Sequence, residues 1–197
     1  MSKIILLTHQ KGGVGKSTLC LNLAICLAKS TKVGIIDIDL QGSLASLRSS
    51  ISGVDIIQSP NEPTKIKSLP YDFIIIDTPP YLSNKIEELM RISDLIIVPT
   101  KAGIFDLLAI RSTVDLIKTA GKLNKSLIVM NMIKPNTTLT LEVMIELAKT
   151  DITLAKTHIS DLVSFTRSVI YNGPGKDVKA ETQITNLTEE LLLMLIS

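Results

Sequence analysis

A glycine-rich run between two lysines is the part of this sequence that says most about chemistry. Residues 11–18 read KGGVGKST and follow a short apolar run, Ile4–Leu7. Glycines allow a tight turn whose backbone N–H groups converge on an anion, and a helix that follows adds the positive end of its dipole. The lysine and hydroxyl that end the run can bind phosphate oxygens and a Mg²⁺ ion. The run therefore predicts a loop that binds ATP with Mg²⁺.

Each position of this loop has an expected part in binding. Lys16 can reach the β- and γ-phosphates, and the Ser17 hydroxyl can ligate Mg²⁺. Gln10 stands where the standard phosphate-loop pattern has its first glycine, so the loop departs from that pattern. The residues that we expect to hold the nucleotide are Gly12, Gly13, Val14, Gly15, Lys16, Ser17 and Thr18.

Two further apolar runs end in carboxylates. One ends with Asp37 and Asp39, which can face a common site because residues two apart on a strand share a side. The other, Asp72–Asp77, is followed by Thr78 and two prolines, which stop a strand and stiffen the next loop. Asp77 is therefore expected to approach Mg²⁺ through water, because Mg²⁺ keeps much of its hydration.

Short apolar runs alternate with longer segments of helical period. We expect strands over Lys3–His9, Lys32–Asp37, Val54–Ile57, Asp72–Asp77, Leu95–Pro99, Ser126–Met132 and Ile152–Thr157. We expect helices over Ser17–Ser30, Asn84–Ile92, Ile104–Ala120, Leu139–Lys149, Leu162–Tyr171 and Gln183–Ile196. This alternation predicts a three-layer α/β fold, a mostly parallel sheet with helices on both faces and the active site at the carboxyl ends of the strands.

Composition sets the class of protein. The chain has 197 residues, of which 45% are hydrophobic and 20% charged, which predicts one globular domain over residues 1–197. Aromatic residues make up only 3%, so Ile, Leu, Val and Ala must form the core, as suits strands buried on both faces. With no targeting segment or membrane-spanning run in view, we expect a cytoplasmic protein.

The loop and the acidic strand ends resemble a known family. Lys-Gly-Gly-x-Gly-Lys-Ser/Thr is the signature of the deviant Walker A ATPases, a P-loop class that includes ParA/Soj partition proteins, MinD and nitrogenase iron protein. Asp-Thr-Pro-Pro after the apolar strand is similar to the ParA branch. The likeness is strong over residues 1–135 and extends more weakly to about residue 180.

The resemblance assigns roles to single residues. It implies that Lys11 reaches across a dimer to the partner's nucleotide, so that ATP binding joins two subunits. It implies that Asp39 orients the attacking water and lies near Mg²⁺, although Leu40 replaces the proline usual in that motif. Asp77 would support the metal, and Asn131, at the end of a strand, would contact adenine. Lys11, Lys16 and Asp39 are thus the expected catalytic residues.

Within the family the sequence is most similar to short, ParF-like ParA proteins, because the chain starts at its first strand, without the helix-turn-helix arm of larger relatives. That similarity implies a nucleoid-associated dimer that binds DNA without sequence preference and hydrolyses ATP weakly until a centromere-binding, ParB-like partner stimulates it. Ser160 and Asp161 stand where many chromosomal members carry arginine. The candidate DNA-binding residues are Lys149, Lys156, Arg167, Lys176 and Lys179.

Other readings of the family compete with this one. A MinD-like protein would end in a basic amphipathic membrane helix, whereas residues 189–197 carry two acids and no base, which favours a helix packed on the core and no membrane partner. A metal-site ATPase would need cysteines in other loops than Cys20 and Cys26. An amidating synthase would need an acceptor-substrate motif, and we find none. A relative that positions a cargo other than DNA stays open.

Overall fold

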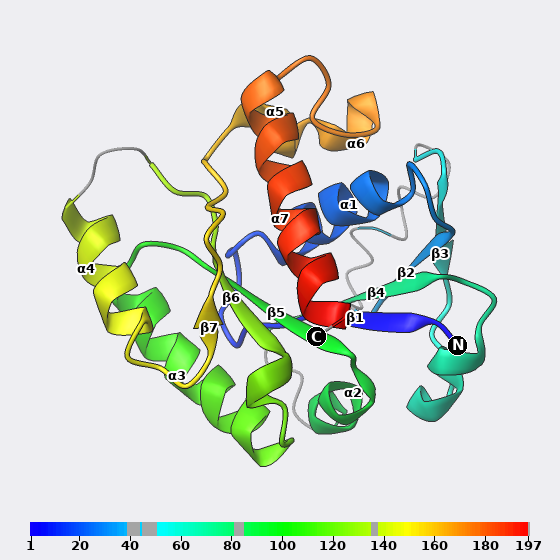
Figure 1. The fold of residues 1–197 in the computed structure, drawn as a ribbon, viewed down its shortest axis with the longest axis horizontal. Coiled ribbons are helices and arrows are strands. Elements are labelled where there is room, and N and C mark those ends of the chain that lie inside the picture. Colours follow the sequence, from blue (N-terminus) through cyan, green and yellow to red (C-terminus); the bar gives the residue numbers. More distant parts are fainter. Residues whose placement is uncertain (39–43, 45–50, 81–84, 135–137, 197) are drawn as a thin grey trace.

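Parallel strands form the centre of the fold (Figure 1). The structure is a computed structural model that describes residues 1–38, 44, 51–80, 85–134 and 138–196. Within these residues the strands are β1 (Lys3–Leu7), β2 (Val33–Asp37), β3 (Val54–Ile57), β4 (Phe73–Asp77), β5 (Leu95–Thr100), β6 (Ser126–Met130) and β7 (Thr153–Leu154). They pair in the order β3-β2-β4-β1-β5-β6-β7, and every pair is parallel. The expected parallel sheet is confirmed.

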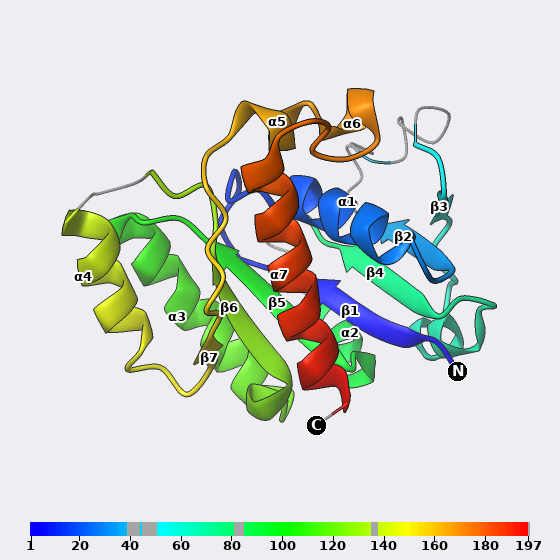
Figure 2. The same cartoon turned by 45° about the horizontal axis from the view of Figure 1, so that its top comes forward.

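Helices cover both faces of this sheet (Figures 1 and 2). They are α1 (Lys16–Leu27), α2 (Ile86–Ile92), α3 (Ile104–Thr119), α4 (Thr138–Leu147), α5 (Val163–Thr166), α6 (Ser168–Tyr171) and α7 (Val178–Ile196), with 3₁₀ turns η2 (Pro63–Ser68) and η3 (Leu123–Lys125). Alternate residues of β1 face opposite layers: Ile5 and Leu7 pack with α1 and α7, and Ile4 and Leu6 with α2 and α3. The three expected layers are present.

Several boundaries differ from those expected. Residues 162–171 form two short helices, α5 and α6, because the backbone leaves helical geometry at Arg167. Strand β7 is short, yet its path continues beside the end of β6 through a parallel bridge between Ile133 and Ser160. Helix α7 begins at Val178, five residues before the expected Gln183, and the Asp177 carboxylate accepts a hydrogen bond from the Ala180 N–H (3.1 Å).

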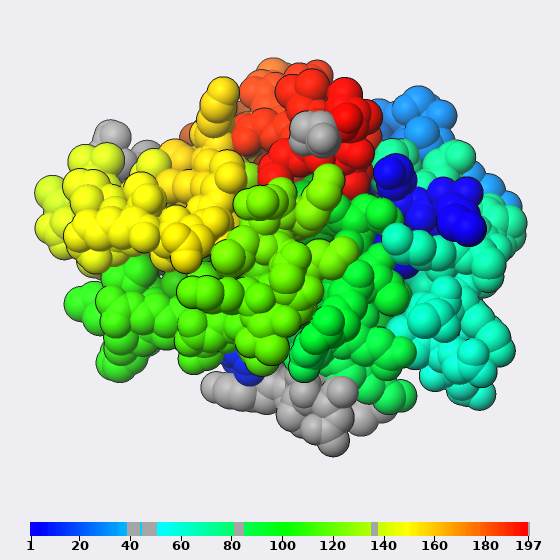
Figure 3. Space-filling view, turned by 60° about the horizontal axis from the view of Figure 1, so that its bottom comes forward, coloured from blue at the N-terminus to red at the C-terminus, as the bar shows by residue number. Residues whose placement is uncertain are grey.

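The last helix packs on the core. In α7 the residues Ala180, Ile184, Leu187 and Leu191 are buried in the layer that contains α1, and Figure 2 shows α7 lying across the sheet beside α1. This confirms the expected core-packing role. Within the described part of the chain, no helix combines the length and the apolarity needed to cross a bilayer. Both the first residues and the end of α7 reach the surface shown in Figure 3.

Candidate nucleotide-binding site

The glycine-rich loop leaves the carboxyl end of β1 and turns directly into α1. Gly13 and Gly15 have φ of 72° and 84°, in the left-handed region that glycine adopts without strain. Gly15 caps α1, and its carbonyl accepts the Leu19 N–H at 2.9 Å. A Cβ at Gly15 would lie 2.4 Å from the Asn131 amide nitrogen, so only glycine fits between the loop and the end of β6. The loop has the shape and the helix start that a phosphate requires.

Lys16 lies inside this loop. Its side chain is buried, and its ammonium donates to the carbonyl oxygens of Lys11 (3.3 Å) and His9 (3.5 Å). Ser17 is half-buried and Thr18 is exposed, both in the first turn of α1, where helical N–H groups point toward the loop. One cation, one hydroxyl and the helix start thus converge where phosphates would bind, which fits the expected roles of Lys16 and Ser17.

A buried histidine supports the start of the loop. His9 Nδ1 accepts the Lys11 N–H at 2.9 Å, so this ring nitrogen carries no proton in the neutral form. Burial, and then the charge of Lys16, lower the pKa of His9 to about 4. His9 is therefore neutral near pH 7 and adds no positive charge beside Lys16.

The acidic strand ends lie side by side beside this loop. Asp37 and Asp77 are register partners across β2 and β4, and Asp77 also pairs with Leu7, the last residue of β1. Asp77 is buried, and the Asp37 carboxylate accepts the Leu44 N–H at 2.9 Å. Asp37 is thus tied to Leu44 through its side chain. Asp39 lies outside the described residues.

These groups fit a Mg²⁺ ion that is shared with phosphate. Ser17 would supply a hydroxyl from α1, and Asp77 would supply a carboxylate from the end of β4. Among the residues that the structure describes, no three His, Cys, Asp or Glu side chains gather as a cation site of their own. Mg²⁺ normally completes its six ligands with phosphate oxygens and water, so this donor set suits Mg²⁺ bound with a nucleotide.

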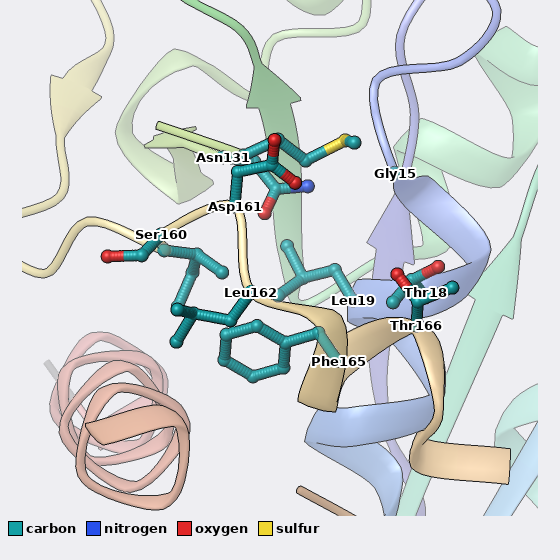
Figure 4. Close-up of a pocket in the computed structure, with 11 residues that line it drawn as sticks. Gly15, Thr18, Leu19, Asn131, Ser160, Asp161, Leu162, Phe165 and Thr166 are labelled. Carbon is teal, nitrogen blue, oxygen red and sulfur yellow. The ribbon is translucent and has the colours of Figure 1, made fainter. Parts of the chain in front are cut away.

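A pocket opens between the loop, the end of β6 and the segment around α5. It is lined by Gly15, Thr18, Leu19, Asn131, Met132, Ile159, Ser160, Asp161, Leu162, Phe165 and Thr166. Figure 4 shows Asn131 and Asp161 at one end, with Leu162, Phe165 and Leu19 below them. An apolar floor with polar groups at one edge suits a planar base.

Asn131 joins this pocket to the phosphate loop. The Asn131 side chain is buried, its amide donates to the Val14 carbonyl oxygen at 2.8 Å, and its backbone N–H donates to Thr100 at 2.7 Å. Met132, the next residue, has a positive φ of 55°, and the chain continues through Ile133 beside the segment that follows β7. Asn131 is thus fixed against the loop, which fits its expected contact with a base.

Sequence reasoning gave no role to several residues of the pocket. Phe165 and Leu162 follow β7 in a stretch without a phosphate-type motif, and only their apolar character marks them. Ser160 is held by α7, because its N–H donates to Gln183 Oε1 (3.0 Å) and its hydroxyl accepts from Gln183 Nε2 (2.9 Å). The place of Ser160 and Asp161 at the pocket follows from the β6–β7 pairing, which the sequence does not reveal.

Lys11 points away from its own loop toward α3. Its ammonium lies 2.8 Å from a carboxylate oxygen of Asp106, the third residue of α3. The loop backbone also contacts α3, since the Gln10 N–H donates to the Thr113 hydroxyl at 3.3 Å. Asp106 is a further site residue for which no sequence motif gave a signal.

The candidate DNA-binding residues are all exposed but do not form one surface. Arg167 and Lys176 line a common groove with Val163, Tyr171 and Pro174, beside α5 and α6. Lys179 follows in the first turn of α7. Lys149 lies past the end of α4, where it pairs with Glu146, and Lys156 lies just after β7. The structure thus brings together Arg167 and Lys176, and it separates Lys149 from them.

Comparisons with known proteins agree with this geometry. A family model described as the CobQ/CobB/MinD/ParA nucleotide-binding domain (CbiA) matches residues 5–174. A curated relative, "Maintenance of carboxysome distribution protein A" of Halothiobacillus neapolitanus, is 31% identical over an alignment of 143 residues that covers 66% of this chain and 66% of that relative. The match thus spans just under two thirds of the relative's length.

Solved structures share the fold over nearly the whole chain. A putative plasmid partition protein of Borrelia burgdorferi bound to AMPPNP has a TM-score of 0.77 at 22% identity, with 98% of this chain and 99% of that one covered. The septum site-determining protein MinD of Pyrococcus horikoshii, complexed with Mg-ADP, has a TM-score of 0.73 at 23% identity, with 97% and 96% covered. Taken with the loop, the acidic strand ends and the family match, these findings show that the chain belongs to the CobQ/CobB/MinD/ParA family of P-loop ATPases.

Proposed function

We propose that this chain is a ParA-type ATPase that binds ATP with Mg²⁺ and forms a dimer around the bound nucleotide. Hydrolysis of the ATP then separates the two subunits. The observation that carries the proposal is the loop at Gly15: it is folded to receive phosphates, with Asp77 beside it and a pocket for a base behind it. A phosphate loop, a metal-side carboxylate and a base pocket in one cleft are what ATP requires.

On this proposal, a few residues of the cleft would bind the nucleotide and carry out its hydrolysis. Lys16 and the first turn of α1 would hold the β- and γ-phosphates, and Ser17 and Asp77 would hold Mg²⁺, which neutralises charge on the transferring phosphate. Asp39 would orient the water whose oxygen bonds to the γ-phosphorus while the bond to the β–γ bridging oxygen breaks. ADP and phosphate leave. Asn131 and the pocket around Phe165 would bind the adenine.

Dimerisation would bring Lys11 to the nucleotide of the second subunit. A cation supplied by the partner stabilises charge on the transferring phosphate and makes hydrolysis depend on assembly. The surface next to Lys11 supports this arrangement, because Ile104, Phe105 and Leu108 of α3 are 65%, 76% and 52% exposed. Large apolar side chains grouped beside a lysine that must cross to a partner fit a surface covered by a second copy of the chain.

We further propose that the ATP-bound dimer binds DNA without sequence preference, and that a centromere-binding partner of the ParB type stimulates its weak ATPase. Arg167 and Lys176 support this proposal, because they line one exposed groove and can contact phosphates. A second candidate is positioning of a protein cargo. It is favoured by the 31% identity to a protein named for carboxysome distribution.

The test uses Asp39→Ala, which we expect to bind ATP but not to hydrolyse it, so that the dimer persists. Binding of this variant to random-sequence duplex DNA would be measured with ATP and with ADP over a series of salt concentrations. We expect ATP-dependent binding that weakens steeply with salt, is reduced by Arg167→Ala and Lys176→Ala, and is unchanged by Lys149→Ala. If the variant forms a dimer with ATP but that dimer does not bind DNA, the DNA proposal is contradicted and a protein cargo is favoured.

A further inference from the structure

The ion pair between Lys11 and Asp106 occupies the lysine that the proposed dimer needs. The Lys11 ammonium lies 2.8 Å from Asp106 Oδ1, and the two side chains are 35% and 8% exposed. The lysine thus stands at the molecular surface, whereas the carboxylate that binds it is almost fully covered by its own chain. The pair ties the phosphate loop to the start of α3.

The Asp106 carboxylate lies against the start of its own helix. It is the third residue of α3, where the positive end of the helix favours a negative charge. A Cβ at Gly103 would lie 2.5 Å from Asp106 Oδ2, so the carboxylate packs directly over the backbone that caps the helix. The Gln10 N–H donates to Thr113 two turns further along α3, which fixes the loop against the same helix. Lys11 therefore meets a prearranged acceptor within its own chain.

A phosphate of the second subunit would compete with Asp106 for the same ammonium. Ile104 and Phe105, the two residues before Asp106 in the first turn of α3, are exposed, so a second copy seated on this surface would cover the pair. Lys11 must leave the carboxylate of its own chain before it can extend to the partner's nucleotide. Because of its γ-phosphate, ATP carries more negative charge than ADP. ATP therefore competes with the Asp106 carboxylate for the Lys11 ammonium better than ADP does.

We propose that Asp106 is a positioning residue that restrains Lys11 within its own subunit and thereby makes dimerisation depend on the γ-phosphate. This inference rests on the proposed role of Lys11 across the dimer. In the single subunit Asp106 neutralises Lys11 and keeps it on α3. In the dimer the partner's nucleotide takes over the ammonium, and the two subunits exchange their lysines symmetrically.

The test is the substitution Asp106→Asn, which keeps the size of the side chain and removes its charge. Sedimentation velocity over a series of protein concentrations would be measured with ATP, with ADP and without nucleotide. We expect the variant to dimerise with ATP at a protein concentration about tenfold lower than wild type, and to form some dimer with ADP. Asp115→Asn, an exposed acid-to-amide change on the same helix, should leave the dimerisation curve unchanged.

Comparing wild type with Lys11→Ala tests the role of Lys11 across the dimer, and comparing wild type with Asp106→Asn tests the restraint. If wild type does not dimerise on ATP, or Lys11→Ala still does, the role of Lys11 across the dimer is wrong and the restraint fails with it. If both behave as proposed but Asp106→Asn dimerises no better than wild type, only the restraint is overturned. In the Lys11→Ala background, Asp106→Asn should not change dimerisation. Stronger dimerisation of that double variant would also contradict the restraint of Lys11 by Asp106. If thermal unfolding shows that Asp106→Asn does not fold, Asp106→Ser, which also removes the charge, takes its place in the same sedimentation experiment with the same expected result.

Discussion

At the scale of single residues, the account depends on how closely Gly15 packs against Asn131. Gly15→Ala adds a Cβ 2.4 Å from the Asn131 amide nitrogen at a φ of 84°. Gly121→Ala is the matched control, because Gly121 has a similar φ of 70° but nothing within 4 Å of an added Cβ. We expect Gly121→Ala to lower the free energy of unfolding by about 1 kcal/mol, and Gly15→Ala by about 1–3 kcal/mol more.

Chemical denaturation measures both unfolding free energies, and titration calorimetry with ATP measures the effect on the site. Gly15→Ala should also weaken ATP binding, because the added methyl displaces Asn131 from the loop, whereas Gly121→Ala should bind ATP normally. Equal losses of stability in the two variants would show that the loop and Asn131 do not pack as described.

The buried His9 should make the stability of the fold depend on pH. Burial and Lys16 lower the pKa of His9 in the folded state to about 4, whereas in the unfolded chain its pKa is near the ordinary histidine value of 6.5. Between these values the unfolded state binds more protons, so stability should fall as pH drops from about 6.5 to about 4, by about 3 kcal/mol in all. Above pH 6.5 His9 is neutral in both states and contributes no further change.

Denaturation curves of His9→Asn and His158→Asn between pH 4 and 7 check this prediction. His9→Asn should flatten the stability profile over that window. Burial also lowers the pKa of His158, but the nearby Glu190 opposes that shift, so His158→Asn should keep most of the slope. A His9→Asn profile as steep as that of wild type would place the titrating group elsewhere.

Much of the site could be predicted at this scale, because chemistry fixed the types and the spacing of its residues. The glycines, Lys16 and Ser17 lie in one short segment, so their meeting needs only a strand that turns into a helix. Asp77 was predictable because parallel strands end at the same edge of a sheet. Asp106 and Asp161 were not, since their approach to the site depends on packing between segments far apart in the chain.

At the scale of elements, α3 presents both the partner of Lys11 and an exposed apolar surface. Phe105→Ser should leave the unfolding free energy of the monomer within about 0.5 kcal/mol of wild type, because the side chain is already 76% exposed. It should raise the protein concentration needed for ATP-dependent dimerisation by about tenfold, because the proposed dimer would bury this aromatic side chain and the variant lacks it.

Leu141→Ser is the matched control, since Leu141 is 63% exposed on α4, a different helix. Sedimentation with ATP would compare the two variants with wild type. Dimerisation that is unchanged in Phe105→Ser, or weakened equally in Leu141→Ser, would place the contact between subunits away from α3.

The order and type of most elements followed from pattern, and the errors have physical causes. Ile-rich runs bounded by charges predict buried strands, and the seven expected strands all occur. The residues from 162 to 171 carry a helical period, but they bend at Arg167, where Phe165 packs into the core and Ser168 bonds to Asn22. The early start of α7 depends on Asp177, which binds both Ser164 and the new helix, a contact that hydrophobic period does not show.

At the scale of the whole molecule, the nucleotide cleft and the exposed groove are joined by one segment. Residues 159–162, Phe165 and Thr166 line the pocket, whereas Val163 and Ser164 of α5 and Arg167, which follows α5, line the groove. The Asn172 side chain also exchanges two hydrogen bonds of 3.1 Å with the backbone of Ser52. On the proposed function, the bound nucleotide and the DNA contact at Arg167 would therefore share one continuous segment of the chain.

ATP-dependent dimerisation is the sharpest test of the proposed function, because it needs the phosphate loop and Lys11 together. Sedimentation velocity of wild type, Lys16→Ala and Lys11→Ala would be measured with Mg-ATP, Mg-ADP and no nucleotide. The account predicts a dimer of wild type with Mg-ATP alone, no nucleotide binding by Lys16→Ala, and an ATP-bound monomer of Lys11→Ala. A wild type that stays monomeric at saturating Mg-ATP, or a Lys11→Ala variant that dimerises as well as wild type, would contradict it.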